Sequence, residues 1–312
     1  MKRLLLLMFV LIILCLVAIY SLIPASITIS NTAHANTIQK NIAVCLRDYN
    51  VWKKWWPGTD SVETDHFSYQ DYTYKLERPL TDGAEIQLEK GGKNFRSRIF
   101  VIPHGKDSSW VEWQTAVTSG YNPFQRVACW LQARTIKDNV QPVLDRLVNF
   151  ASNTANLYGY PIVRTTFTDT ILAATKFSTN TYPTTDLIYN AIDQLKTRIR
   201  DAGAEEKDFP MLNVQQTDSN RFQTMIAICV NKEIPNGGNV FVSRMVPMKD
   251  RFLRTEVTGG PASITNAHDA VRTYMEDRFL SAPAIPFEIL VTDRRAQADT
   301  SKWKTIIFHP SM

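Results

Sequence analysis

Two stretches in the second half of the chain resemble each other, and this internal repeat limits the possible folds more than any other feature. The first begins at Thr175 and the second at Thr255, a period of roughly 80 residues. Further positions match in residue type: Ala191 with Ala270, Pro210 with Pro286, Asp218 with Asp293, and Thr224 with Thr305. The offset changes by only a few residues along the repeat, as insertions in the connecting loops would cause.

Each copy predicts a strand, a helix and a two-stranded hairpin. Apolar residues recur at helical spacing in both copies: Leu187, Ile188, Ala191, Ile192, Leu195 and Ile199 in the first, and Ala267, Ala270, Val271, Tyr274, Met275 and Phe279 in the second. One copy cannot bury its own helix and sheet face. We therefore expect the two sheets to pair edge to edge, with both helices on one face and a central groove on the other. A chance similarity of two βαββ units is the alternative interpretation.

The N-terminal segment predicts the cellular location. Residues 4–23 carry no charge, and about 20 apolar residues are enough to cross a bilayer as a helix. Because Lys2 and Arg3 precede them, we expect a single-pass anchor over residues 1–24. The N-terminus would be cytoplasmic and both domains extracytoplasmic, or periplasmic in a Gram-negative cell. The alternative is a signal peptide cleaved after Ala35, which would also remove a strand predicted at 27–30.

Residues 25–158 predict a second type of domain. A helix is expected at 37–48, alternating strands between 67 and 118, and helices at 122–133 and 138–158. A curved antiparallel sheet folded around its last helix would leave an interior cavity. The Trp-rich segment 51–57 packs the first helices against the sheet or lines the mouth of that cavity. Trp110 and Trp113 cannot both point inwards on a regular strand, because they are an odd number of residues apart.

This order of elements, with the helix ending in NVWKKWWPG, resembles the START-like (SRPBCC, polyketide-cyclase-like) superfamily over residues 25–158. The resemblance implies a helix-grip fold with a deep apolar cavity for a lipid-like or aromatic small molecule. The fold class expected for the whole chain is therefore α+β, with a transmembrane helix, a START-like domain and a duplicated βαββ domain.

Residues 159–312 resemble the GyrI-like small-molecule-binding domain, which is the effector-binding domain of many multidrug-sensing regulators. The motifs that carry the resemblance are GGP at 259–261, PFE at 286–288 and IIFHP at 306–310. The resemblance implies that the acid after the proline–aromatic pair, Glu288, faces the groove and meets a cationic or polar ligand. A solvent-facing strand position is the alternative for Glu288. The first copy has Leu212 at the matching position, so the groove should hold one acid.

Three aromatic residues are candidates for the walls of this groove: Tyr274, Trp303 and Tyr189. Each of them can equally belong to the core. The chain departs from the regulators because it has no helix-turn-helix segment. Without the anchor and its two flanking cations, 33 basic and 30 acidic residues leave a net charge of only +3, which gives no electrostatic footprint for DNA. We therefore expect a small-molecule ligand and the membrane as partners, and no nucleic acid.

Catalytic and metal-binding patterns are missing from the sequence. The four cysteines form no CxxC pair and the five histidines no HxxxH pair, so no metal or other cofactor is expected. No GxSxG, P-loop or GxGxxG occurs. A hydrolase or cyclase-like enzyme, using Glu288 with Trp303 and Glu256, is an alternative function. A second titratable group opposite Glu288 would favour that alternative.

The sequence thus predicts a membrane-anchored protein that captures or senses an apolar ligand, either neutral or cationic. A structural or interaction protein with collapsed pockets is the remaining alternative.

Overall fold

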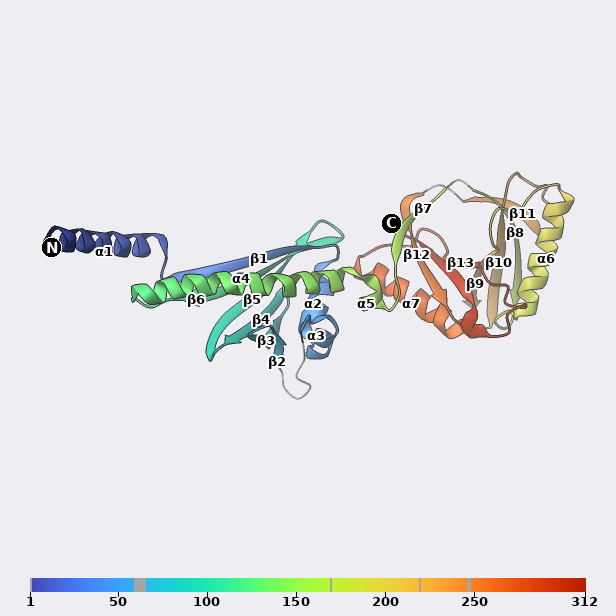
Figure 1. Ribbon diagram of the computed structural model, residues 1–312. Helices are drawn as coiled ribbons and strands as arrows, with labels where there is room; N and C mark the ends of the chain where they lie inside the picture. Colours follow the sequence, from blue (N-terminus) through green and yellow to red (C-terminus); the bar gives the residue numbers. More distant parts are fainter. Residues whose placement is uncertain (1, 59–65, 169, 219, 246–247) are drawn as a thin grey trace. The chain divides into compact units, whose positions relative to one another are not determined.

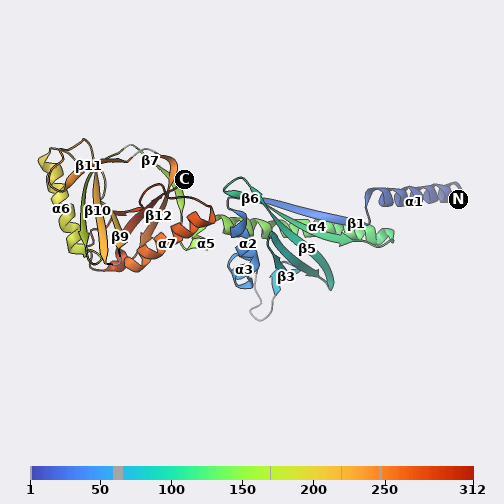
Figure 2. The same cartoon turned by 180° about the vertical axis from the view of Figure 1, so that it is seen from behind.

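The computed structural model describes residues 2–58, 66–168, 170–218, 220–245 and 248–312. The chain divides into two compact units, Met1–Asn153 and Thr154–Met312. Each unit contains one antiparallel sheet, and the mixed α+β architecture predicted from the sequence is confirmed (Figures 1 and 2).

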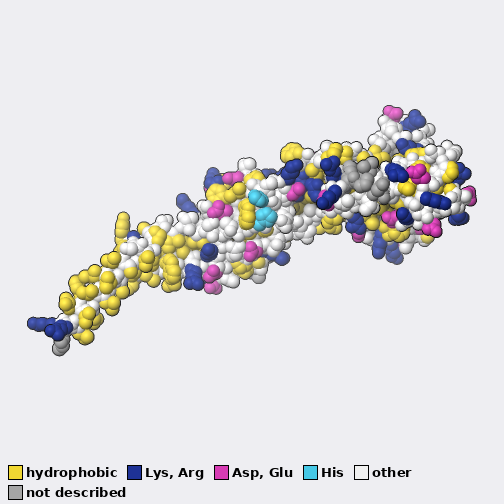
Figure 3. All heavy atoms as spheres, turned by 90° about the horizontal axis from the view of Figure 1, so that it is seen from above, with side chains coloured by type: hydrophobic (Ala, Val, Ile, Leu, Met, Phe, Trp, Pro, Cys, Tyr) yellow, Lys and Arg dark blue, Asp and Glu magenta, His cyan; other side chains and the backbone are white. Residues whose placement is uncertain are grey.

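Helix α1 (Lys2–Leu22) holds the apolar N-terminal segment. It has 21 residues, an 18-residue stretch of it has a mean hydropathy of 3.1, and none of its side chains is buried. At about 1.5 Å per residue its length matches the roughly 30 Å of a hydrocarbon core. Figure 3 shows a surface of hydrophobic side chains along this helix. By length and composition, α1 qualifies as a membrane span.

The first unit contains a six-stranded sheet in the order β1-β6-β5-β4-β3-β2. Its strands are β1 (Ser26–Ala35), β2 (His66–Tyr69), β3 (Tyr72–Leu80), β4 (Gly83–Lys90), β5 (Lys93–His104) and β6 (Ser108–Thr118). Its helices after α1 are α2 (Gln39–Arg47), α3 (Tyr49–Trp55) and α4 (Pro123–Ser152). Strand β1 is longer than predicted and pairs with β6 from Ser26 to Ala35. Cleavage after Ala35 would therefore remove this edge strand completely.

Helix α4 is continuous, whereas the sequence predicts two helices with a break between 133 and 138. Its apolar stripe runs through the expected break, because Ala133, Ile136 and Val140 are all buried. Asn122 caps the first turn by accepting a hydrogen bond from the backbone N–H of Phe124 at 2.9 Å. Residues of the predicted end of this helix form a separate short helix, α5 (Thr154–Tyr158), which belongs to the second unit.

Four of the six tryptophans of the first unit are buried in its core. Trp52 and Trp55 are completely buried, and their indole N–H groups donate to the carbonyls of Leu46 and Cys45. Trp113 is also completely buried, whereas Trp110 is 43% exposed, as their odd spacing requires.

Large side chains fill part of the space between the sheet and α4. Trp113 contacts the ring of Tyr74 edge-on, and the Tyr74 hydroxyl donates to the Asn139 side chain on α4. These groups lie where the sequence predicts an interior cavity.

The second unit contains an eight-stranded sheet in the order β11-β8-β10-β9-β13-β14-β12-β7. Its strands are β7 (Val163–Phe167), β8 (Thr170–Thr179), β9 (Met211–Asp218), β10 (Arg221–Val230), β11 (Val240–Met245), β12 (Met248–Thr258), β13 (Phe287–Leu290) and β14 (Lys304–Pro310). Its longer helices are α6 (Thr185–Asp201) and α7 (Pro261–Asp277), and a 3-10 turn, η1 (Thr300–Lys302), precedes β14.

The two copies of the repeat have the same strand register. Thr175 lies opposite Ile226, which lies opposite Leu212. In the second copy Thr255 lies opposite Ile307, which lies opposite Glu288. The copies join edge to edge where Leu212 faces Glu288 across β9 and β13. The matched positions of the repeat thus meet at the centre of the sheet.

Both helices pack on the same face of this sheet. Helix α6 buries Ile188, Ile192 and Leu195 against strand residues of the first copy, including Ile226 and Ile228. Helix α7 buries Ile264 and Ala267 against Val257 and Ile307. The opposite face carries its own apolar cluster, which includes Met211, Phe252, Phe287 and Phe308.

Candidate functional site

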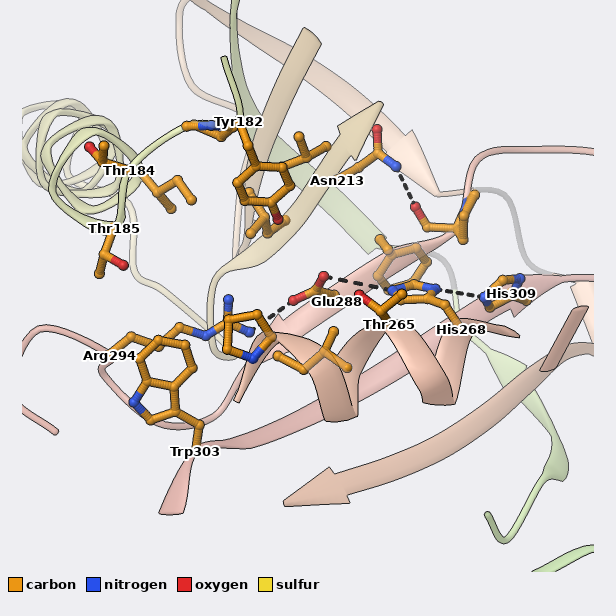
Figure 4. Close-up of a pocket in the computed structure, with 18 of the residues that line it drawn as sticks. Tyr182, Thr184, Thr185, Asn213, Thr265, His268, Glu288, Arg294, Trp303 and His309 are labelled. Carbon is orange, nitrogen blue, oxygen red and sulfur yellow. Dashed lines mark hydrogen bonds and ion pairs between the residues drawn. The ribbon is translucent and has the colours of Figure 1, made fainter. Parts of the chain in front are cut away.

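A pocket of about 680 Å³ lies between α6 and α7, on the helix side of the sheet (Figure 4). Its floor includes Leu212 and Glu288 from the junction of the two copies. Each helix packs on the strands of its own copy, so the junction between them remains open. The volume falls in the range of ligand-binding pockets, about 300–1,000 Å³.

The position of this pocket corrects one prediction. The sequence was interpreted to place the groove with Glu288 on the face opposite the helices, and the structure places Glu288 on the helix face. The reason is the register. Glu288 shares its face with Leu212 and Ile307, which point towards the helices, while its neighbour Phe287 belongs to the cluster on the other face.

Glu288 is nearly enclosed, with 13% of its side chain exposed. Its Oε2 lies 2.8 Å from Nη2 of Arg294, and its Oε1 lies 3.7 Å from Nε2 of His268. Figure 4 shows the carboxylate between these two partners. A buried carboxylate is costly unless it is paired and hydrogen-bonded, and Glu288 is both.

Two partners position the Arg294 guanidinium. Its Nη2 also donates to Oγ1 of Thr305 at 3.0 Å, and the group lies 5.0 Å from the ring centroid of Trp303. Only 10% of the Arg294 side chain is exposed. Its backbone N–H donates to the Tyr189 hydroxyl at 2.8 Å, so α6 helps to hold the loop that carries the arginine.

His268 connects Glu288 to a second histidine. Nδ1 of His268 lies 2.9 Å from Nε2 of His309, whose side chain is buried. Burial, the His268 ring and the charge of Arg272 lower the pKa of His309 to about 3, so this imidazole is neutral at physiological pH. Glu288, His268 and His309 thus form one row of neighbouring side chains.

The pKa of Glu288 reflects opposing effects. Burial raises it, but the hydrogen bonds and charges supplied by His268 and Arg294 outweigh burial and lower the pKa below its usual value. The carboxylate is therefore ionised at neutral pH. The sequence predicts a cationic or polar ligand as the partner of Glu288, whereas the structure provides Arg294. Arg294 lies in the loop only six residues further along the chain.

The structure brings together only part of the predicted site. Glu288 and Trp303 both line the pocket. Tyr189 is buried beneath the loop after β13, where its hydroxyl donates to the carbonyl of Thr292 at 3.1 Å, and it is not among the lining residues. Tyr274 packs with Leu253 and Val271 in a separate cluster outside the pocket.

Glu256, the second acid of the enzyme alternative, is also remote from this site. It projects from the opposite sheet face, is 61% exposed and pairs with Arg254. Four lining residues that the sequence analysis did not select are Tyr182, Thr265, His268 and Arg294. One signal could have found His268: it follows Ile264 by one helical turn, on the buried side of α7.

A second hollow of about 440 Å³ lies on the sheet face without helices. Its lining is mainly apolar and includes Met211, Met225, Met245, Phe252 and Phe287. Phe287 and Glu288 are consecutive residues, so the two hollows lie on opposite sides of β13. The larger pocket is the better candidate site, because it contains the buried charged groups.

No protein-family model matches the sequence, and no curated protein matches it. Among solved structures, the EcmrR C-terminal domain is 16% identical with a TM-score of 0.42, over 49% of this chain and 98% of that chain. EcmrR in a complex with DNA is 16% identical with a TM-score of 0.43, over 60% and 70% of the two chains. A hydrolase from Listeria innocua is 11% identical with a TM-score of 0.36, over 49% and 91%. At these values the likenesses establish neither a family nor an activity, so the function is inferred from the pocket.

Proposed function

We propose that the second unit, Thr154–Met312, is a GyrI-like domain that binds a small molecule between α6 and α7. One observation carries the proposal: a hollow of ligand size surrounds a buried carboxylate that the chain itself orients. Such a combination of apolar walls with a few fixed polar groups is typical of ligand sites. The duplicated βαββ fold supports it by leaving the junction of the copies uncovered.

The lining defines the chemistry of the ligand. Apolar contacts come from Ile188, Leu212 and Val214, and the ring of Trp303 adds an aromatic surface. Hydroxyl groups of Tyr182 and Thr265 also reach the lining. Because Arg294 already neutralises Glu288, a cation must displace the arginine before it can pair with the carboxylate. We therefore propose an apolar ligand with hydrogen-bonding groups, and the positive charge stays a prediction.

We further propose that α1 anchors the chain in a membrane, with the N-terminus cytoplasmic and both units extracytoplasmic. Residues 4–22 of α1 carry no charge, none of its side chains is buried, and Lys2 and Arg3 begin the helix, which supports this topology. For the first unit, the order of strands and the long helix α4 support a START-like assignment. The absence of a nucleic-acid partner stays a prediction.

Acid–base catalysis is a second candidate function, favoured by one contact. A second titratable group opposite Glu288 is the feature that would favour an enzyme, and His268 is such a group, with 3.7 Å between the nearest atoms of the two side chains. An ionised carboxylate beside an imidazole can accept and return a proton during a reaction. A bound substrate would therefore be converted, whereas a sensed ligand would be recovered unchanged.

The test is a thermal-shift screen of the full chain in detergent micelles against uncharged and cationic apolar compounds. Thr265→Trp places a large ring in the pocket lining, and the matched control Asn266→Trp places it one residue further, outside the lining. We expect compounds that stabilise the wild type and Asn266→Trp, and that have no effect on Thr265→Trp. Equal stabilisation of both variants would contradict the site. Mass spectrometry of each compound after incubation separates binding from turnover.

A further inference from the structure

The first unit carries an exposed apolar patch where α4 begins. Among its described residues after α1, seven large hydrophobic side chains are exposed, and four of these lie within eleven residues: Tyr121, Phe124, Trp130 and Leu131. Tyr121 is 90% exposed and Phe124 is 83% exposed. Single exposed apolar residues are ordinary, but a contiguous group of them indicates a contact surface.

Helical geometry places part of this patch on one stripe. Phe124, Ala128 and Leu131 are spaced by four and then three residues on α4, so they share a face, and all three are exposed. The opposite side of the same turns carries Cys129 and Ala133, which are buried in the unit. The apolar stripe is therefore not part of the core of its own unit.

Several contacts hold the patch beside the C-terminal end of α1. Arg126 donates from Nη1 to the carbonyl of Ile23 at 2.8 Å, and its guanidinium lies 4.5 Å from the ring centroid of Tyr20. The Tyr20 hydroxyl donates to the carbonyl of Tyr121. The backbone N–H of Ser119 donates to the carbonyl of Ala25 at 2.8 Å. The aromatic patch thus begins where the apolar helix ends.

A bilayer is the partner that this arrangement fits. Aromatic side chains gather at the boundary between hydrocarbon and headgroups, on either side of a membrane-spanning helix. Tyr20 and Tyr121 are at this level, and Phe124 follows within one turn. We propose that the start of α4, residues 121–131, is a membrane-surface docking site that enters the lipid interface beside α1.

This proposal rests on the proposed anchoring by α1, and one experiment separates the two. The full chain is reconstituted into vesicles of phosphatidylcholine and phosphatidylglycerol, and nitroxide labels report depth by their accessibility to oxygen and to a water-soluble nickel chelate. The native Cys15 lies in the middle of α1 and is exposed, whereas the other three cysteines are buried. A label on Cys15 therefore tests the anchor alone.

The patch is tested with Ala128→Cys in a Cys15→Ala background, which keeps all four large side chains. A matched control is Asp138→Cys, which is exposed on the same helix about 15 Å further along. We expect oxygen accessibility to exceed nickel accessibility at 15 and 128, and the reverse at 138. Adding Tyr121→Asp and Phe124→Asp should shift the label at 128 to the value at 138.

Each other outcome overturns a specific claim. If the label at 128 matches 138 while Cys15 is in lipid, the docking site is wrong and the anchor is retained. If Cys15 is accessible to nickel, the anchoring itself is wrong. Shielding from both reagents at 128, with spin–spin broadening that disappears on dilution with unlabelled chain, would assign the patch to a second copy and contradict the proposal.

Discussion

Replacing Arg294 with methionine tests the electrostatics of the pocket. The substitution keeps most of the apolar stem and removes the cation that lies 2.8 Å from Glu288. Both side chains are nearly buried, so the carboxylate would lose its strongest partner without gaining water. Removal of one partner of a buried pair costs about 3–5 kcal/mol. We expect the free energy of unfolding of the second unit to fall by this amount at pH 7.

The sign of the pH dependence follows from the lowered pKa of Glu288. In the wild type the carboxylate binds protons less readily in the folded chain than in the unfolded one. Its stabilising contribution is present above the unfolded pKa, about 4.3, and is lost as the pH falls through the lower folded pKa. Without Arg294, burial is opposed only by His268, so the pKa rises and the residue folds as a neutral acid at pH 4. The variant should therefore differ from the wild type less at pH 4 than at pH 7.

The assay can be confined to the second unit. Cys229 is the cysteine of this unit and is buried. Urea-dependent modification of Cys229 by dithiodipyridine, quantified by peptide mass spectrometry, reports its unfolding in the full chain at both pH values. The double variant Glu288→Gln/Arg294→Met should recover part of the loss, because no buried charge remains unpaired. A loss of less than about 1 kcal/mol in Arg294→Met at pH 7, the size expected for exposed pairs, would refute the buried ion pair.

Three further predictions concern other parts of the fold. The pKa of His309 is about 3 in the folded chain and ordinarily 6.5, so below pH 6.5 the unfolded chain binds a proton that the folded chain does not. The free energy of unfolding of the wild type should therefore fall by about 2 kcal/mol between pH 7.5 and 5 because of this residue. His309→Gln should show a correspondingly weaker pH dependence in the Cys229 assay. Gly83 has a φ of +156°, and a Cβ there would lie 1.8 Å from the carbonyl oxygen of Ile99. Gly83→Ala should therefore destabilise the first unit by more than about 1 kcal/mol, measured by urea-dependent modification of Cys45. The control Gly91→Ala, at an exposed glycine where a Cβ would have no neighbour within 4 Å, should destabilise the unit less. Asn139→Ala removes the acceptor of the buried Tyr74 hydroxyl and should cost about 1–3 kcal/mol in the same assay, and an unchanged midpoint would show that the hydrogen bond is unimportant.

The internal repeat was sufficient to predict much of the fold of the second unit. Matching Pro210 with Pro286 places Leu212 and Glu288 at equivalent positions, and these two residues meet at the junction of the copies. The repeat could not predict which face of the sheet holds the pocket. Alternation along a strand assigns residues to two faces, but it does not indicate which face the helices cover. That depends on how α6 and α7 pack.

The partners of Glu288 depend on tertiary structure. His268 is on α7 and Arg294 is in a loop, and only folding brings them to the same carboxylate. Tyr274 lies on an apolar helical stripe, a position that favours the core over a pocket wall, and in the structure it packs with Leu253 and Val271. The predicted break in α4 was wrong, because residues 133–138 contain no glycine or proline that would end the helix. Pro142 is accommodated inside the helix.

Photo-crosslinking can locate the ligand within the chain. A diazirine derivative of the compound that stabilises the wild type most is irradiated with the full chain, and the modified peptides are identified by mass spectrometry. Ligand binding between α6 and α7 predicts modification of Tyr182–Thr185 and of Ile264–Arg272, lost in Thr265→Trp. Modification confined to Ser243–Met245 and Pro283–Ile285, which line the hollow on the other face, would contradict a ligand site around Glu288.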